Sequence, residues 1–109
     1  MIGFRKKAEH PGAISLDKGD NLTPQSAEVA RIWVTNNAGS SVWIDAHVLA
    51  DPVAFGYLIA DTMRHAARAY ATTYDADEVT MLQAISDGVV EELREQFASI
   101  TTIQEGKLN

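Results

Sequence analysis

The stretch that decides the fold is ARIWVTNNAGSSVWIDA, residues 30–46. Its two ends, residues 30–35 and 41–46, alternate in polarity and are rich in β-branched and aromatic side chains, which is typical of strands. Between them lies NNAGS, residues 36–40, which consists of turn formers. The stretch therefore predicts a β-hairpin with a longer loop.

If Thr35 lies opposite Ser41, each residue of the first strand has a partner of matching chemical character on the second strand. One face then carries only aliphatic side chains, and the other carries an aromatic pair and a charged pair. The aliphatic face consists of Ile32, Val34, Val42 and Ile44. On the other face Trp33 is opposite Trp43, and Arg31 is opposite Asp45.

The two indoles face outward if the aliphatic face packs on helices. Two coverings for them stay open. One is the N-terminal segment, through Phe4 or Ile14. The other is an interface with another protein, because Trp is enriched at interaction hot spots. The interface candidates are Trp33, Trp43, Arg31 and Asp45.

Two helices are expected after the hairpin. Asp51-Pro52 has the residue types of an N-cap and a first helical position, and apolar residues then recur every three or four positions to about Ala71. Asp75 with Glu78 resembles a capping box, and a second apolar stripe follows it and ends near Ala98. The short connection between the stripes predicts an αα-hairpin.

These elements predict one α+β domain over residues 23–99, in which a β-hairpin packs against two long antiparallel helices. Thr23-Pro24 predicts a short N-terminal helical turn before the hairpin, running through Glu28. Residues 1–22 and 100–109 lack a helix or strand period and are expected to be flexible tails.

Composition restricts the function. The 109 residues carry 9 Lys+Arg against 15 Asp+Glu, a net charge of −6, which argues against nucleic-acid binding. The absence of cysteine removes thiolate metal sites and suits a cytoplasmic protein. No apolar run reaches the roughly 20 residues that span a membrane, so no membrane association is expected.

Several short segments resemble a small, mainly alphaproteobacterial family, the domain of unknown function 5076. They are Ile32-Trp33-Val34, Asp51-Pro52, Gly56, Asp61 and the run from His65 to Tyr70. The resemblance covers about residues 23–97 and implies a single-domain bacterial protein with no known activity, cofactor or catalytic residue. Trp43 departs from the family pattern, in which a smaller residue is usual.

One cluster of charged side chains has the residue types of a catalytic or anion-binding site. Asp61, Arg64, His65 and Arg68 follow at i, i+3, i+4 and i+7, so they share one side of the first helix. The carboxylate could orient the imidazole as a general base while the arginines hold an anion. The structural alternative is ordinary pairing of helix neighbours. No metal-binding or glycine-rich phosphate motif occurs, so no metal or cofactor is expected.

The sequence therefore favours a non-enzymatic protein-interaction or self-association domain. The alternative is a small ligand-binding protein or enzyme that uses the Asp61, Arg64, His65 and Arg68 face. Because a two-stranded ribbon has two unpaired edges, we expect a homodimer, which could join two hairpins into a four-stranded sheet.

Overall fold

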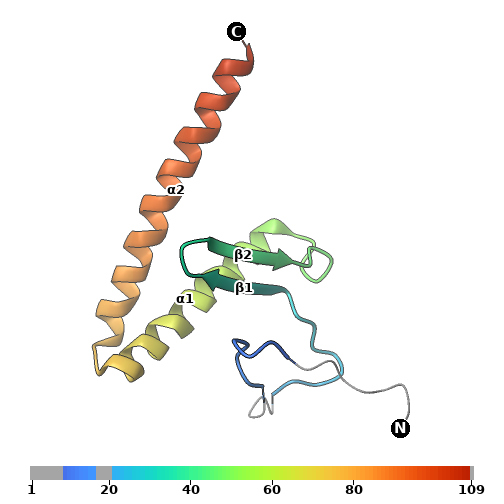
Figure 1. Cartoon of the computed structure of the whole chain (residues 1–109), viewed down its shortest axis with the longest axis vertical. Helices are drawn as coiled ribbons and strands as arrows, with labels where there is room; N and C mark the ends of the chain where they lie inside the picture. The colour runs from blue at the N-terminus through green and yellow to red at the C-terminus, as the bar shows by residue number, and fades with distance from the viewer. Residues whose placement is uncertain (1–8, 17–20, 109) are drawn as a thin grey trace. The chain divides into compact units, whose positions relative to one another are not determined.

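The computed structural model describes residues 9–16 and 21–108, with residues 99–108 described by their backbone. Its elements follow in the order β1, β2, α1, α2 (Figure 1). The chain forms two compact units, Met1–Val48 and Leu49–Asn109, and each is described by itself. The first holds an antiparallel hairpin and the second a pair of helices, which confirms the α+β class.

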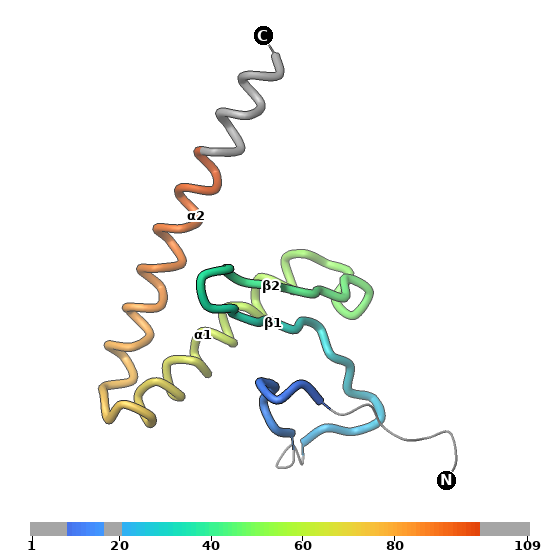
Figure 2. Tube along the Cα trace, viewed as in Figure 1, coloured from blue at the N-terminus to red at the C-terminus, as the bar shows by residue number. Residues whose placement is uncertain are grey.

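The hairpin consists of β1, Ala30–Thr35, and β2, Gly39–Ile44. Thr35 lies opposite Gly39. The predicted register, with Thr35 opposite Ser41, is therefore wrong by two residues. The cause is a loop shorter than the five residues that the sequence indicated, visible as the tight bend between β1 and β2 in Figure 2.

Two left-handed residues close this loop. Asn37 has φ 63° and Gly39 has φ 80°, and the Ala38 N–H donates to the carbonyl of Thr35 at 3.0 Å. A positive φ at the third turn position is typical of a type II turn, and a glycine adopts a positive φ without a steric cost. Gly39 and Ser40 are thereby released from the loop and extend β2.

A shift of two residues leaves every side chain on its predicted face, because strand side chains alternate with a period of two. The aliphatic face still holds Ile32, Val34, Val42 and Ile44. On the other face Trp33 lies opposite Ser41, and Trp43 lies opposite Arg31. The two indoles are therefore diagonal neighbours on one face. The prediction that Trp33 lies directly opposite Trp43 is wrong.

The predicted pair of Arg31 and Asp45 is also absent, because each residue has a nearer partner. The Arg31 guanidinium makes a two-pronged ion pair with Glu28, with Nη2–Oε1 2.9 Å and Nε–Oε2 3.2 Å. Asp45 follows the end of β2 and accepts the backbone N–H of His47 at 3.0 Å. The Asp45 side chain thus caps a local turn, while its backbone N–H continues the ladder by donating to the Val29 carbonyl at 2.9 Å.

Thr23 opens a hydrogen-bonded turn, not the helical turn through Glu28 that we predicted. The Ser26 N–H donates to the Thr23 carbonyl at 2.9 Å, and the Thr23 N–H donates to the Ser26 hydroxyl at 2.9 Å. Pro24 occupies the second turn position, where its fixed φ is favoured. The reciprocal hydroxyl bond satisfies the turn locally, and residues 26–29 continue without helix.

Helix α1 spans Pro52–Tyr74. Asp51 precedes it in extended conformation, and its Oδ1 accepts the Val53 N–H at 2.9 Å, so the predicted N-cap with proline at the first position is confirmed. The helix ends at Asp75, whose backbone is left-handed with φ 53°, and the next N–H, that of Ala76, donates to the Ala71 carbonyl at 2.9 Å.

Helix α2 spans Glu78–Leu108 and turns back from the end of α1, forming the expected αα-hairpin (Figure 1). Its cap is Asp77, whose Oδ2 accepts both the backbone N–H and the hydroxyl of Thr80, each at 2.9 Å. The predicted capping box of Asp75 with Glu78 is therefore wrong, because Asp75 already ends α1 in the left-handed conformation.

The helix also continues through the polar stretch that we expected to be a tail. Residues 100–108 are helical in the structure. No proline interrupts residues 78–108, and Ile100 and Ile103 extend the spacing of three to four residues beyond Phe97. The helix therefore continues although the stretch is mostly polar and contains Gly106.

The helix pair packs along one stripe of each helix. Among the described residues Ala67 is the only buried one. Half-buried apolar positions recur on α1 at Phe55, Leu58, Ile59, Met63, Ala66 and Ala71, and on α2 at Met81, Leu82, Ile85 and Val89. From residue 90 to 98 every side chain is exposed. As far as its residues are described, no helix has the length and apolar character that crossing a bilayer requires.

Candidate functional site

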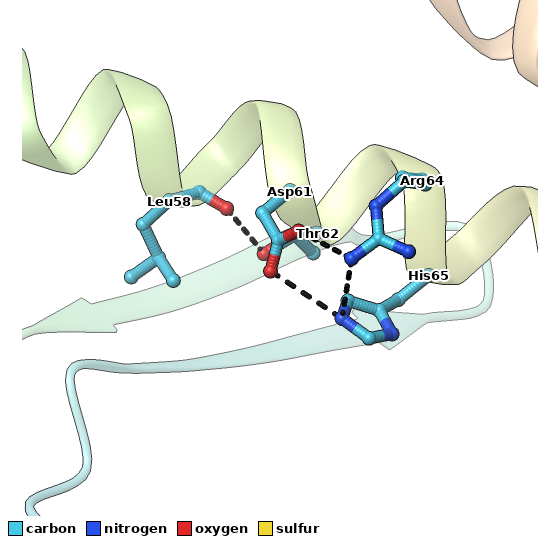
Figure 3. A network of polar contacts seen from close by, with 5 residues as sticks. All are labelled: Leu58, Asp61, Thr62, Arg64 and His65. Atoms are coloured by element: carbon cyan, nitrogen blue, oxygen red, sulfur yellow. Dashed lines mark hydrogen bonds and ion pairs between the residues drawn. The ribbon is translucent and has the colours of Figure 1, made fainter.

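The predicted cluster on α1 is formed by three of its four residues. Asp61, Arg64 and His65 are neighbours on adjacent turns, and Figure 3 shows both basic side chains directed at the carboxylate. Arg64 Nη2 lies 2.7 Å from Asp61 Oδ1, and His65 Nε2 lies 3.3 Å from Asp61 Oδ2. The carboxylate therefore uses one oxygen for each partner.

Arg68 does not join this network. Its Nε lies 3.5 Å from Glu78 Oε1, at the first residue of α2. The fourth predicted residue thus pairs with the neighbouring helix and leaves the anion-holding role to Arg64 alone. Arg64 is itself occupied by Asp61.

The electrostatics of the cluster favour ionised Asp61. The hydrogen bond from Arg64 lowers the pKa of Asp61 below its ordinary value, and the positive charge of Arg64 adds to the effect. An aspartate in this state is a poor proton donor near neutral pH. It can still orient the imidazole of His65 through the Nε2 contact.

The cluster lies on an open surface. The side chains of Asp61 and Arg64 are each 50 % exposed and that of His65 is 61 % exposed. Two clefts of the structure are lined by residues of the first unit, and neither of them includes any of these side chains. Among the described residues no group of three or more His, Asp or Glu is placed to hold a metal ion. The arrangement is that of paired helix neighbours in contact with solvent.

The second candidate surface is the indole face of the hairpin. An open cleft of about 590 Å³ is lined by His10, Arg31, Trp33, Thr35, Ser41 and Trp43. Trp43 is 61 % exposed. Trp33 is half-buried, since the His10 ring stands edge-on to it, with ring centroids 5.1 Å apart and an interplanar angle of 78°.

His10 was missed by the sequence analysis. The sequence offered Phe4 or Ile14 as the covering of the indoles, with an interface as the alternative. Phe4 lies outside the described residues, and Ile14 is 88 % exposed. His10 is held instead by a local turn, in which the Gly12 N–H donates to His10 Nδ1 at 2.9 Å. The sequence signal was the dipeptide of Pro11 and Gly12, a turn former that places the imidazole.

Comparison with known proteins gives matches of two kinds, to solved structures and to a family. No curated protein matches the chain. Four solved chains resemble it. One is described as the "structure of a putative pyruvate dehydrogenase" from the photosynthetic bacterium Rhodopseudomonas palustrus CGA009. It is 28 % identical, with a TM-score of 0.58, and the alignment covers 81 % of this chain and 88 % of that one.

The family comparison covers most of the hairpin and helices. Residues 20–97 match the family described as domain of unknown function 5076, a range that includes β1, β2, all of α1 and α2 up to Phe97. This range agrees with the extent of the resemblance found in the sequence. The chain belongs to the family of the domain of unknown function 5076.

Proposed function

We propose that this protein is a non-enzymatic interaction domain that associates with a second copy of itself. The observation that carries the proposal is that Ala67 is the only buried residue among those described. A folded domain of ordinary size buries many large apolar side chains, since their burial is the main favourable term in folding. A second copy would supply the missing apolar contacts.

The end of the α2 stripe is the surface that we assign to this contact. Val90, Leu93 and Phe97 are 52 %, 44 % and 66 % exposed. They continue the apolar stripe whose half-buried positions end at Val89, and residues 90–98 are all exposed. A second α2 could cover them as one helix covers another in a bundle.

The hairpin offers a competing surface for the same assembly. The two-stranded sheet has two unpaired edges, which favour pairing with an identical chain around a two-fold axis. The interface candidates Trp33, Trp43, Arg31 and Asp45 belong to this arrangement. The exposure of Trp43 supports it, and the ion pair of Arg31 with Glu28 leaves Arg31 less available to a partner.

The pyruvate dehydrogenase activity in the description of the solved relative is not part of our proposal. The two alignment coverages make that chain about as long as this one. Oxidation of a keto acid relies on a bound cofactor held and oriented in an enclosing site. The alternative site formed by Asp61, Arg64 and His65 lies on the open face of one helix. A cytoplasmic location belongs to the same proposal and is supported by the cysteine-free sequence.

Sedimentation equilibrium tests the association over roughly a hundredfold range of concentration. The expected result is a mass that rises from one chain of 11.9 kDa toward two chains. Phe97→Ser removes a large apolar side chain and should weaken association about tenfold or more. Tyr57→Ser is the matched control, since Tyr57 is an aromatic residue of similar exposure, 74 % against 66 % for Phe97, but lies outside the stripe.

The outcomes separate the two surfaces. Dissociation caused by Phe97→Ser and not by Trp43→Ser places the interface on α2. Dissociation caused by Trp43→Ser alone moves it to the hairpin and overturns our assignment to α2. A mass of one chain at every concentration would refute self-association.

A further inference from the structure

We propose that the cleft on the indole face of the hairpin binds a neutral, proline-containing peptide segment in extended conformation. The indole cleft is the one lined by His10, Arg31, Trp33, Thr35, Ser41 and Trp43. Its volume, about 590 Å³, lies within the range of ligand sites. This inference is independent of the proposed self-association and goes beyond it.

The spacing of the two indoles suits a proline ring. Trp33 is opposite Ser41, and Trp43 is opposite Arg31, so the indoles are diagonal neighbours on one face. Diagonal positions of an antiparallel pair are about 7–8 Å apart. A ring inserted between two such side chains would lie about 3.5–4.0 Å from each, the distance of optimal carbon contact.

The chain itself already places a turn against one of the two indoles. The turn at His10, Pro11 and Gly12 lies against Trp33. A Cβ placed on Gly12 would lie 3.7 Å from Cζ3 of this indole, which is ordinary contact. Trp33 is thus already in contact with a turn of the chain through His10 and Gly12, while Trp43 is still 61 % exposed.

Hydrogen-bond donors are available for the carbonyl groups of the ligand. A polyproline II segment has no internal hydrogen bonds, so its carbonyls need donors from the protein. The cleft is lined by both tryptophans, whose indoles carry an N–H group, and by Thr35 and Ser41, whose side chains carry a hydroxyl. None of the hydrogen bonds found in the described part of the chain uses the indole N–H of Trp43. Aromatic-lined grooves with this chemistry are a recurring mode of proline recognition.

Charge argues for a neutral ligand. The positive charge of Arg31 is balanced by Glu28 at 2.9 Å. His10 accepts the Gly12 N–H at Nδ1. The cleft therefore presents no unbalanced charge that would select an anion, and Arg31 disfavours a cation between the indoles.

Intrinsic fluorescence gives a direct test, because Trp33 and Trp43 are the only tryptophans in the chain. The full-length protein is titrated with the capped hexapeptide of proline. The expected result is a saturable shift of the emission, with a capped glycine-serine hexapeptide of the same length giving none. Titrations with choline, a cation, and with benzoate, an anion, test whether the cleft selects a charged ligand instead.

Variants locate the binding. Trp43→Ala should weaken hexaproline binding at least about tenfold, with Trp33 as the remaining reporter. Val34→Ala is the matched control, since Val34 is 80 % exposed on the opposite face of β1 and its loss should leave the affinity unchanged. Retained far-ultraviolet circular dichroism shows that the variants still fold.

Four results would overturn the inference. They are the absence of a response to hexaproline, an equal response to the glycine-serine peptide, a response only to choline or benzoate, and an emission that changes only with protein concentration. The last would assign the indole face to a second copy. Hexaproline binding by a protein that stays monomeric would support the inference while refuting the proposed self-association.

Discussion

Arg68 and Glu78 form an ion pair between the two helices, with 3.5 Å between Nε and Oε1. Their side chains are 63 % and 46 % exposed, so solvent screens the attraction. We predict that Glu78→Gln lowers the free energy of unfolding by less than about 1 kcal/mol and that the effect shrinks further at high salt. Urea unfolding at two ionic strengths measures both. A larger loss would mean that the pair has a structural role that its exposure does not explain.

The N-cap of α1 should contribute more to the free energy of unfolding than the ion pair between Arg68 and Glu78. Asp51→Ala removes the oxygen that accepts the Val53 N–H and is expected to lower the free energy of unfolding by about 1 kcal/mol. Asp51→Asn keeps an acceptor oxygen and serves as the control, with a loss of only a few tenths. Denaturant titration of the three proteins gives the comparison. Equal losses for both variants would show that charge, not the cap bond, is responsible.

The left-handed residue at the end of α1 offers a stabilising substitution. Asp75 has φ 53°, a conformation that costs a non-glycine residue about 1 kcal/mol, and Asp75→Gly should recover part of that cost. Asp75→Val should have the opposite effect, because a β-branched residue is disfavoured there. Thermal unfolding should therefore order the melting temperatures as glycine above aspartate above valine. Any other order would contradict the role of this backbone conformation.

Asp61 should titrate below an ordinary aspartate. Arg64 lowers its pKa in the folded chain, so the pair stabilises the fold above the ordinary value of about 3.9, and this stabilisation is lost as pH falls through the lowered pKa. NMR titration of the side-chain carboxyl should show the low pKa and its rise in Arg64→Gln. Asp77 is the internal control, since its pKa is lowered by hydrogen bonds from Thr80 and should not change in this variant.

Sequence reasoning found the elements because their signals are local. Asp51-Pro52 contains both the cap oxygen and the fixed φ of the first helical residue, so the start of α1 could be read directly. The strand faces were correct because alternation alone sets them. The register was wrong because it depends on the φ of Asn37 and Gly39, and the residue types permit left-handed conformations without requiring them.

The other wrong predictions concern residues for which more than one partner or role was available. Asp75 and Asp77 both have the chemistry of an N-cap, and the choice between them is made by the way α1 ends. For the candidate site, spacing placed Asp61, Arg64 and His65 together, but Arg68 found a partner on α2 that helix periodicity alone does not show. His10 lay outside any regular element, so its contact with Trp33 had no periodic signal.

The two short connections of this fold have a consequence for its folding speed. A loop of three residues, 36–38, joins β1 to β2, and three residues, 75–77, join α1 to α2. Each pairing therefore closes a small loop, which costs little entropy, and chains dominated by such local contacts fold within microseconds to milliseconds. If two chains must then meet, that encounter becomes the slow step. Refolding would show a fast phase independent of concentration, followed by one whose rate rises with protein concentration.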